Sequence, residues 1–220
     1  MELDHLFVFV DGPSEAEEAL TLLGLDETYR RVHPGQGTAN VCCAFDDAYL
    51  ELLWLTSPDE ARSPRTARTR LFERALWREN GCCPFGIAWR GSTDPLLDVW
   101  AYAPLYLPEG MTIEVAVDSD DPMQPMLFAS PGKDPPAAWP PERRGRLQRG
   151  RGRSTLGAVT LRLPETCAPA PALLLAADRL GIALEHGTAW ELVVQPPYGE
   201  GVRELRLPIS GERSGDLARR

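Results

Sequence analysis

The order of secondary-structure elements in the first 55 residues is the feature that most limits the possible folds. Leu3 to Val10 is rich in Val and Phe and predicts a strand. Ser14 and Glu17 fit a capping box at the start of a helix, which Gly24 ends. Three further strands are expected, over residues 27–32, 38–45 and 48–55. The segment therefore predicts a βαβββ module whose last strand is central in its sheet.

The rest of the chain repeats this pattern less regularly. After a helix at 71–79, a second module is expected with strands at 85–89, 111–117 and 125–129 and a helix at 94–102. A third set has a helix at 171–180 and strands at 156–163, 183–186, 189–195 and 202–207. The predicted fold class is α+β with repeated βαβββ modules. Paired modules occupy 1–130, a Pro- and Arg-rich connector 131–153, an additional βαβββ-like module 154–210 and a polar tail 211–220.

Charge and cysteine content exclude several classes of function. The 220-residue chain has a net charge of −9 and a pI of about 4.9, so we expect no general binding to nucleic acid or to an anionic membrane. Five cysteines without a C-x-x-C spacing disfavour a zinc or redox motif and indicate buried thiols in reducing surroundings. Without a signal-like or membrane-spanning apolar run, a cytoplasmic location is predicted.

Six arginines lie within residues 143–153, at the end of the connector. Such a run can bind an anion or a partner. It is also typical of a solvated, irregular loop. Both interpretations stay open at the level of sequence.

Two polar residues lie within otherwise apolar predicted strands, His5 in the first strand and Glu51 in the fourth. A carboxylate in an apolar strand loses hydration unless it has a partner, which suits a general base. A histidine beside it can hold a divalent metal or move a proton. The structural alternatives are a histidine bonded to backbone and an edge-strand glutamate that faces water.

The segment between these strands adds further polar candidates. Gly35 and Gly37 predict a flexible turn that permits close backbone approach, and no phosphate-loop pattern follows them. His33, Thr38 and Asn40 either present polar atoms to a ligand or only tie down the turn. Thr38 and Asn40 share a strand face because alternate residues of a strand point the same way.

With these residues the chain resembles the glyoxalase-like domain branch of the vicinal oxygen chelate superfamily. The resemblance rests on three segments, residues 3–6, 33–40 and 49–52. It implies that two βαβββ modules pair, with curved mixed sheets enclosing a cleft. It also implies a metal in that cleft, held in each module by a His on the first strand and a Glu on the fourth. His5 and Glu51 match these positions in the first module.

The later modules depart from this implied ligand set. The second module offers Pro84 or Phe85 for the His, and Met126 or Leu127 for the Glu. The third offers Thr155 or Leu156 for the His, whereas Glu204 matches the Glu. The implied metal ligands are therefore His5, Glu51 and Glu204. The ion would be Mn, Fe, Ni, Mg or Zn, or there is no metal at all.

Two classes of function follow from the resemblance. The first is a metal-dependent lyase, isomerase or dioxygenase for a small oxygen-rich molecule, with Glu51 and His33 catalytic. The second is a metal-free protein that binds or sequesters a small molecule. Thr38, Asn40, Phe7 and Trp89 are the candidate substrate-binding residues, although the two aromatic side chains also suit ordinary packing. A homodimer is compatible with both classes.

Overall fold

The first 55 residues form the predicted βαβββ module in the computed structural model, which describes residues 1–195 and 204–208. Its elements are β1 (Glu2–Phe9), α1 (Pro13–Leu23), β2 (Tyr29–His33), β3 (Thr38–Ala44) and β4 (Tyr49–Leu55). β4 pairs in parallel with β1 and antiparallel with β3, so it is an interior strand. The predicted capping box is wrong, because α1 begins at Pro13, and its N-cap Gly12 makes no side-chain hydrogen bond. Proline suits the first helical position because its φ is already helical.

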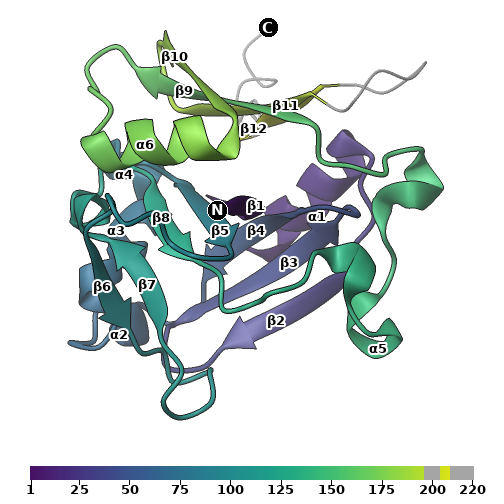
Figure 1. The fold of residues 1–220 in the computed structure, drawn as a ribbon, viewed down its shortest axis with the longest axis horizontal. Helices are drawn as coiled ribbons and strands as arrows, with labels where there is room; N and C mark the ends of the chain where they lie inside the picture. Colours follow the sequence, from purple (N-terminus) through teal and green to yellow (C-terminus); the bar gives the residue numbers. More distant parts are fainter. Residues whose placement is uncertain (196–203, 209–220) are drawn as a thin grey trace, which may run out of the picture.

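Residues 85–129 contribute four more strands. They are β5 (Phe85–Arg90), β6 (Val99–Tyr102), β7 (Ile113–Ala116) and β8 (Met126–Ala129), with the 3-10 helix η2 (Val117–Asp120) before β8. β1 and β5 pair antiparallel and join both halves into one curved sheet of order β2-β3-β4-β1-β5-β8-β7-β6 (Figure 1). The first two modules are therefore the ones that pair.

Two predicted helices differ from the structure. The helix over 94–102 is wrong, because a turn and then strand β6 occupy these residues. Pro95 and the Asp94 side chain, which accepts a hydrogen bond from the Leu96 N–H at 2.9 Å, favour the turn. The helix over 71–79 is divided at Leu76 into α3 (Leu71–Ala75) and α4 (Trp77–Asn80). Helix α2 (Pro58–Ala61) and the 3-10 helix η1 (Ala67–Thr69) precede them.

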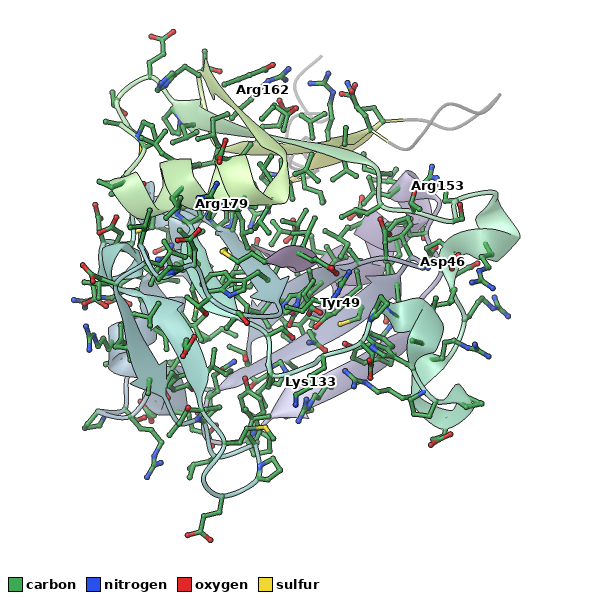
Figure 2. All side chains as sticks on the ribbon, viewed as in Figure 1. Asp46, Tyr49, Lys133, Arg153, Arg162 and Arg179 are labelled. Atoms are coloured by element: carbon green, nitrogen blue, oxygen red, sulfur yellow. The ribbon has the colours of Figure 1, made fainter. Side chains whose placement is uncertain are left out.

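The connector folds back onto the first module and contains three short helices. These are η3 (Pro136–Ala138), α5 (Pro141–Arg144) and η4 (Gln148–Arg151). The Asp46 backbone N–H donates to the Ser154 carbonyl at 2.7 Å, and its carbonyl accepts from the Ala137 N–H at 3.1 Å. Asp46 and Arg153 lie on this side of the molecule in Figure 2. Hydrogen bonds to the first module thus fix the path of the connector.

The last described elements form a separate four-stranded sheet. They are β9 (Ala158–Pro164), α6 (Pro171–Leu180), β10 (Ile182–Gly187), β11 (Glu191–Gln195) and β12 (Leu205–Leu207). The element order is βαβββ, but the strand order β10-β9-β11-β12 differs from that of the first module. The beginning of the strand predicted at 202–207 and the predicted tail lie outside the described residues. None of the helices in the described ranges is long and apolar enough to cross a membrane.

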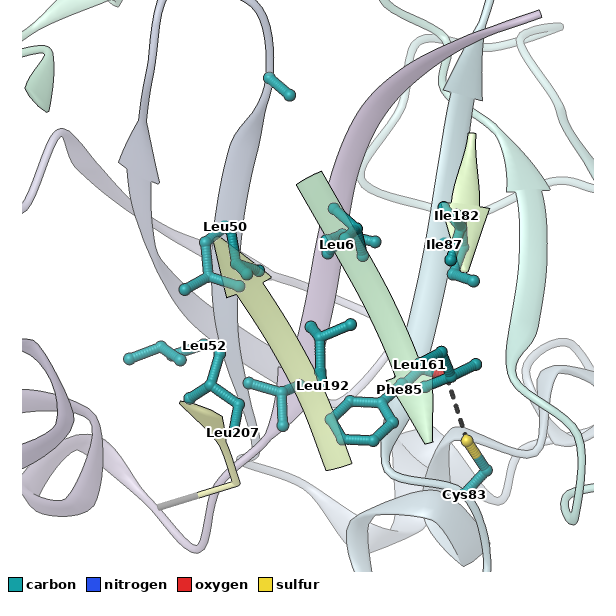
Figure 3. Packing of buried hydrophobic residues seen from close by; sticks show 14 of the residues in the cluster. Leu6, Leu50, Leu52, Cys83, Phe85, Ile87, Leu161, Ile182, Leu192 and Leu207 are labelled. Atoms are coloured by element: carbon teal, nitrogen blue, oxygen red, sulfur yellow. Dashed lines mark hydrogen bonds between the residues drawn. The ribbon is translucent and has the colours of Figure 1, made fainter. Parts of the chain in front are cut away.

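The small sheet and α6 cover one face of the large sheet. Side chains of β1, β4 and β5, such as Leu6, Leu50 and Ile87, pack against Leu161 and Leu192 of the small sheet (Figure 3). Helix α6 lies against β1, β8 and η2. The structure describes every residue between β5 and β6, and no α-helix lies there. Helix α6 therefore covers the half of the large sheet that the second module leaves without a helix. Arg162 lies on this sheet and Arg179 on α6 (Figure 2).

A bulge in β1 determines which side chains face the other side of the large sheet. The pairing of β1 with β5 shifts between Leu3 and His5. Leu3 consequently packs with Leu6 and Val8 against the small sheet, whereas Phe7 belongs to the opposite cluster. Regular alternation along the strand would instead have placed Leu3 on the same face as His5. The bulge leaves His5 and Phe7 together on the open face.

Candidate active site

A cavity of about 120 Å³ lies on the face of the large sheet opposite the small sheet. Strands of both modules contribute to it, together with α3, the β6–β7 connection and the connector. The residues that line it are His5, Phe7, Tyr29, Arg31, His33, Gln36, Asn40, Tyr49, Glu51, Leu53, Leu71, Tyr102, Tyr106, Leu107, Ile113, Met126, Phe128, Ser130, Pro131, Gly132 and Arg143. Its polar groups come mainly from the first module.

Four buried polar side chains form a line at the base of the cavity: His5, Asn40 and Glu51 line it, and Asp4 contacts His5. His5 Nδ1 lies 2.8 Å from Asp4 Oδ2, and His5 Nε2 lies 3.5 Å from Glu51 Oε2. Asn40 Nδ2 donates to Glu51 Oε1 at 2.5 Å. Strand pairing brings these groups together, since His5 is opposite Tyr49 in the β1–β4 ladder and Asn40 is opposite Leu53 in the β3–β4 ladder. The four side chains thus come from three adjacent strands.

The ionised form of Asp4 sets the orientation of the imidazole. Burial alone would raise the pKa of Asp4, but its hydrogen bond and attraction to His5, with help from Ser130 and Arg90, hold that pKa below its usual value. The carboxylate therefore accepts a hydrogen bond from the Nδ1–H and leaves Nε2 to face Glu51. A neutral Nε2 and an ionised carboxylate are both acceptors. At 3.5 Å the two groups are therefore placed to share one proton that either of them takes up.

His33 is a second buried histidine of the cavity, and it is neutral. Burial, with smaller contributions from the charges of Arg31 and His5, lowers its pKa to about 4, although Glu51 acts in the opposite direction. Its Nδ1 lies 2.9 Å from Thr38 Oγ1, which also accepts from Gln36 Nε2 at 2.8 Å. At neutral pH the ring therefore offers a hydrogen bond rather than a positive charge.

The wall that faces these polar groups is apolar and comes from the second module. Met126 and Phe128 of β8 and Ile113 of β7 line it, and Ala88 lies directly opposite His5 in the β1–β5 ladder. Tyr49 stacks on the His5 ring at 4.3 Å. A ligand in this cavity thus meets hydrogen-bonding groups on one side and hydrocarbon on the other.

The structure brings together most of the residues predicted for the site. His5, Phe7, His33, Asn40 and Glu51 all line the cavity. Thr38 lies behind it and touches His33.

Two predicted residues do not join them. Trp89 is packed in the core on the other face of β5, because a one-residue step along a strand reverses the face. Glu204 lies beside the small sheet, where its Oε1 is 2.6 Å from Arg206 Nη2.

Several residues in or beside the cavity were not predicted from the sequence. Asp4 escaped notice because the bulge, which no sequence pattern marks, brings it beside His5. Tyr29, Arg31 and His33 are alternate residues of β2 and therefore share one face. That spacing could have identified Tyr29 and Arg31 from the sequence. Arg143 reaches the cavity only through the folded path of the connector.

The donor set at the base does not match a permanently held metal ion. His5 Nε2 and Glu51 Oε2 are the two groups that face each other there. The described residues contain no cluster of three or more His, Cys, Asp or Glu side chains suited to a metal. Catalytic metal sites usually have three protein ligands, and the facing positions of the second module are Ala88, Met126 and Phe128.

Solved structures resemble this chain in fold. A hypothetical protein from Staphylococcus aureus matches with a TM-score of 0.50 and 10% identity over 86% of this chain and 87% of its own. Methylmalonyl-CoA epimerase from Streptomyces coelicolor matches with a TM-score of 0.40 and 16% identity, over 59% of this chain and 97% of its own. Methylmalonyl-CoA epimerase from Mycobacterium tuberculosis matches with a TM-score of 0.38 and 14% identity, over 58% of this chain and 85% of its own. No curated protein sequence matches this chain.

The curved sheet of two paired modules around a cavity is consistent with the fold of the vicinal oxygen chelate superfamily. Within it, residues 3–95 match the sequence model of the glyoxalase-like domain. This part of the chain is therefore similar to a glyoxalase-like domain. The matched segment contains the whole first module and β5, and so it includes His5, His33, Asn40 and Glu51.

Proposed function

We propose that the protein is an isomerase or lyase that transfers a proton at a carbon next to a carbonyl group of a small, oxygen-rich molecule. The observation that carries this proposal is the alignment of Asp4, His5 and Glu51 at the base of a cavity with an apolar opposite wall. Such an arrangement supplies a base and a group that holds the proton. Removal of water from the apolar side strengthens both roles.

Glu51 is the proposed base. Asn40 donates to Oε1, which orients the carboxylate and leaves Oε2 available. Oε2 lies beside His5 Nε2, so a proton taken from carbon can pass to the imidazole. The positive charge of the resulting imidazolium is stabilised by the Asp4 carboxylate at Nδ1. Return of that proton to the former carbonyl carbon, as the substrate hydroxyl proton moves to the former carbonyl oxygen, completes isomerisation. Departure of a leaving group from the next carbon, with that proton going to the leaving group, completes elimination.

His33 and Asn40 are the proposed groups for the oxygen atoms of the substrate. A neutral histidine can donate a hydrogen bond to an oxygen on which negative charge develops. Asn40 Oδ1 is buried, and no described residue hydrogen-bonds to it. It is therefore available to accept from a substrate hydroxyl.

Exchange of substrate protons with solvent tests the proposal without knowledge of the natural substrate. Small 2-oxo and 2-hydroxy carbonyl compounds are incubated with the protein in D2O, and deuterium at the carbon next to the carbonyl is followed by proton NMR. We expect exchange in at least one compound, and a loss of about a hundredfold or more in Glu51→Gln, because a positioned base typically contributes 10²–10⁴-fold. The matched control is Glu18→Gln, since Glu18 is exposed on α1. Exchange that survives Glu51→Gln would refute the assignment of the base.

A metal-free binding protein is the second candidate. The apolar wall of Met126, Phe128 and Ile113 supports it, since such a surface holds a ligand without any chemistry. The same compounds separate the two candidates. Saturable binding with no deuterium incorporation in the wild-type protein would favour binding alone.

A further inference from the structure

Two arginines at the opening of the cavity have no carboxylate partner. Arg31 of β2 and Arg143 of α5 both line the cavity, and both are exposed to solvent. Neither forms an ion pair with an acidic side chain of the described residues, in a protein of net charge −9. By contrast, two other arginines of the connector are paired: Arg146 Nη1 lies 3.7 Å from Asp26 Oδ1, and Arg149 Nε lies 2.6 Å from Asp46 Oδ1.

Aromatic rings hold both guanidinium groups in place. The Arg143 guanidinium carbon lies 4.3 Å from the centre of the Trp139 ring, and that of Arg31 lies 5.0 Å from the Tyr106 ring. Arg31 Nη2 also donates to the Tyr106 carbonyl at 3.3 Å. Stacked guanidinium groups keep their in-plane N–H donors available for an oxyanion. They also lose less conformational freedom when a ligand binds.

Both arginines lie on the same side of the opening. Trp139, on which Arg143 stacks, packs edge-on against Tyr29 at 5.9 Å. Tyr29 and Arg31 are alternate residues of β2 and both line the cavity. Trp139 itself is almost fully buried, and its Nε1 donates to the Asp134 carbonyl at 3.0 Å. The connector is thus fixed where it presents Arg143 beside the strand that carries Arg31.

We infer that the cavity takes an anionic substrate, a small carboxylate or phosphate ester whose oxyanion binds Arg31 and Arg143. The inference rests on the proposed function and adds the class of substrate. Positive charge lies at the opening, whereas Asp4 and Glu51 lie at the base. An anion is repelled from the base and held at the opening, so the uncharged, carbonyl-bearing end of the molecule points toward Glu51. One charged group therefore orients the substrate for proton transfer.

Equilibrium binding of simple probes tests the inference. The probes are malonamate, which carries one carboxylate, inorganic phosphate, and malonamide, the uncharged analogue of malonamate. Binding is followed by amide chemical-shift changes of the 15N-labelled protein. We expect malonamate or phosphate to bind in a saturable manner and more tightly than malonamide, and their relative affinities identify the preferred oxyanion. Absence of saturable anion binding up to the solubility limit of both probes would overturn the inference.

Variants of the two arginines show whether the anion binds where the geometry places it. Arg31→Gln and Arg143→Gln are each expected to weaken anion binding about tenfold, because a hydrogen bond to a charged group contributes roughly that much, and to leave malonamide binding unchanged. Arg65→Gln is the matched control, since Arg65 is exposed, has no ion pair to a described carboxylate, and does not line the cavity. Equal loss in the control would show a general charge effect and refute the site.

The test remains informative if the proposed proton transfer fails. Anion binding is measured at equilibrium and is repeated in Glu51→Gln, where proton transfer is removed. Retained anion binding in that variant, with loss in the arginine variants, supports the substrate class independently of the reaction. Loss of deuterium exchange in Glu51→Gln alone would in turn support the base without reference to the anion.

Discussion

The buried, neutral His33 makes the stability of the protein depend on pH in a defined range. Its pKa in the folded protein is about 4, compared with an ordinary value of 6.5 in the unfolded chain, chiefly because burial disfavours the charged ring. Between these values the unfolded chain binds a proton that the folded protein does not. The contribution of neutral His33 to the free energy of unfolding is therefore fully present above pH 6.5 and is lost as the pH falls toward 4.

The size of this effect follows from the same two values. Each pKa unit corresponds to about 1.4 kcal/mol, so protonation of His33 would lower the free energy of unfolding by about 3 kcal/mol at pH 4. That is a large fraction of the roughly 5–15 kcal/mol typical of a folded domain. The ring also contacts Thr38 and Tyr106, and those contacts make its local adjustment to a charge difficult.

Urea denaturation at a series of pH values measures the effect, with tryptophan fluorescence as the signal. Carboxyl groups of the unfolded chain begin to bind protons near the lower end of this range, so the informative quantity is the difference between wild type and His33→Gln. We expect this difference to change by about 3 kcal/mol between pH 7 and pH 4. His186→Gln is the control, since His186 is exposed on β10. Parallel curves for wild type and His33→Gln would refute the reasoning.

Two further predictions concern the base of the cavity and the core. Elemental mass spectrometry of protein purified without an affinity tag should find well below one metal ion per chain. A near-stoichiometric ion that is lost in His5→Ala/Glu51→Ala would instead establish these residues as ligands. Leu161→Ala should lower the free energy of unfolding by about 2–5 kcal/mol in urea denaturation, because Leu161 is fully buried between the two sheets. A loss below about 1 kcal/mol would show that this interface contributes little to stability.

The sequence was sufficient for the first module because each of its elements carries a local signal. Alternating or continuous apolar residues mark the strands, and Gly24 ends the helix in the left-handed conformation, with φ 61°. Residues 94–102 were wrongly assigned because Leu96, Leu97 and Trp100 have helical spacing. Pairing of β6 with β7 determines the conformation there, and such a long-range contact has no local signal.

In the candidate site, too, residues marked by a local sequence signal were predicted, whereas those placed by long-range contacts were not. His5 and Glu51 were identified because a polar residue in an apolar strand is unusual, and their pairing follows from adjacent strands. Trp89 was misplaced because the register of β5 decides its face. Arg143 was recognised only as part of an arginine run, since its position depends on hydrogen bonds such as the one from Gln148 Nε2 to the Asp26 carbonyl at 2.6 Å.

Helix α6 has a consequence for the order of events during synthesis. It covers the β5–β8 half of the large sheet, yet it is encoded more than 40 residues after β8. A nascent chain that has emerged only as far as the connector lacks both α6 and the small sheet, and therefore exposes Leu6, Leu50 and Ile87 to water. Because exposed apolar surface promotes aggregation, the ribosome-bound chain is vulnerable until its last quarter is made. A stop codon after residue 153 would therefore yield an insoluble product rather than a smaller working protein.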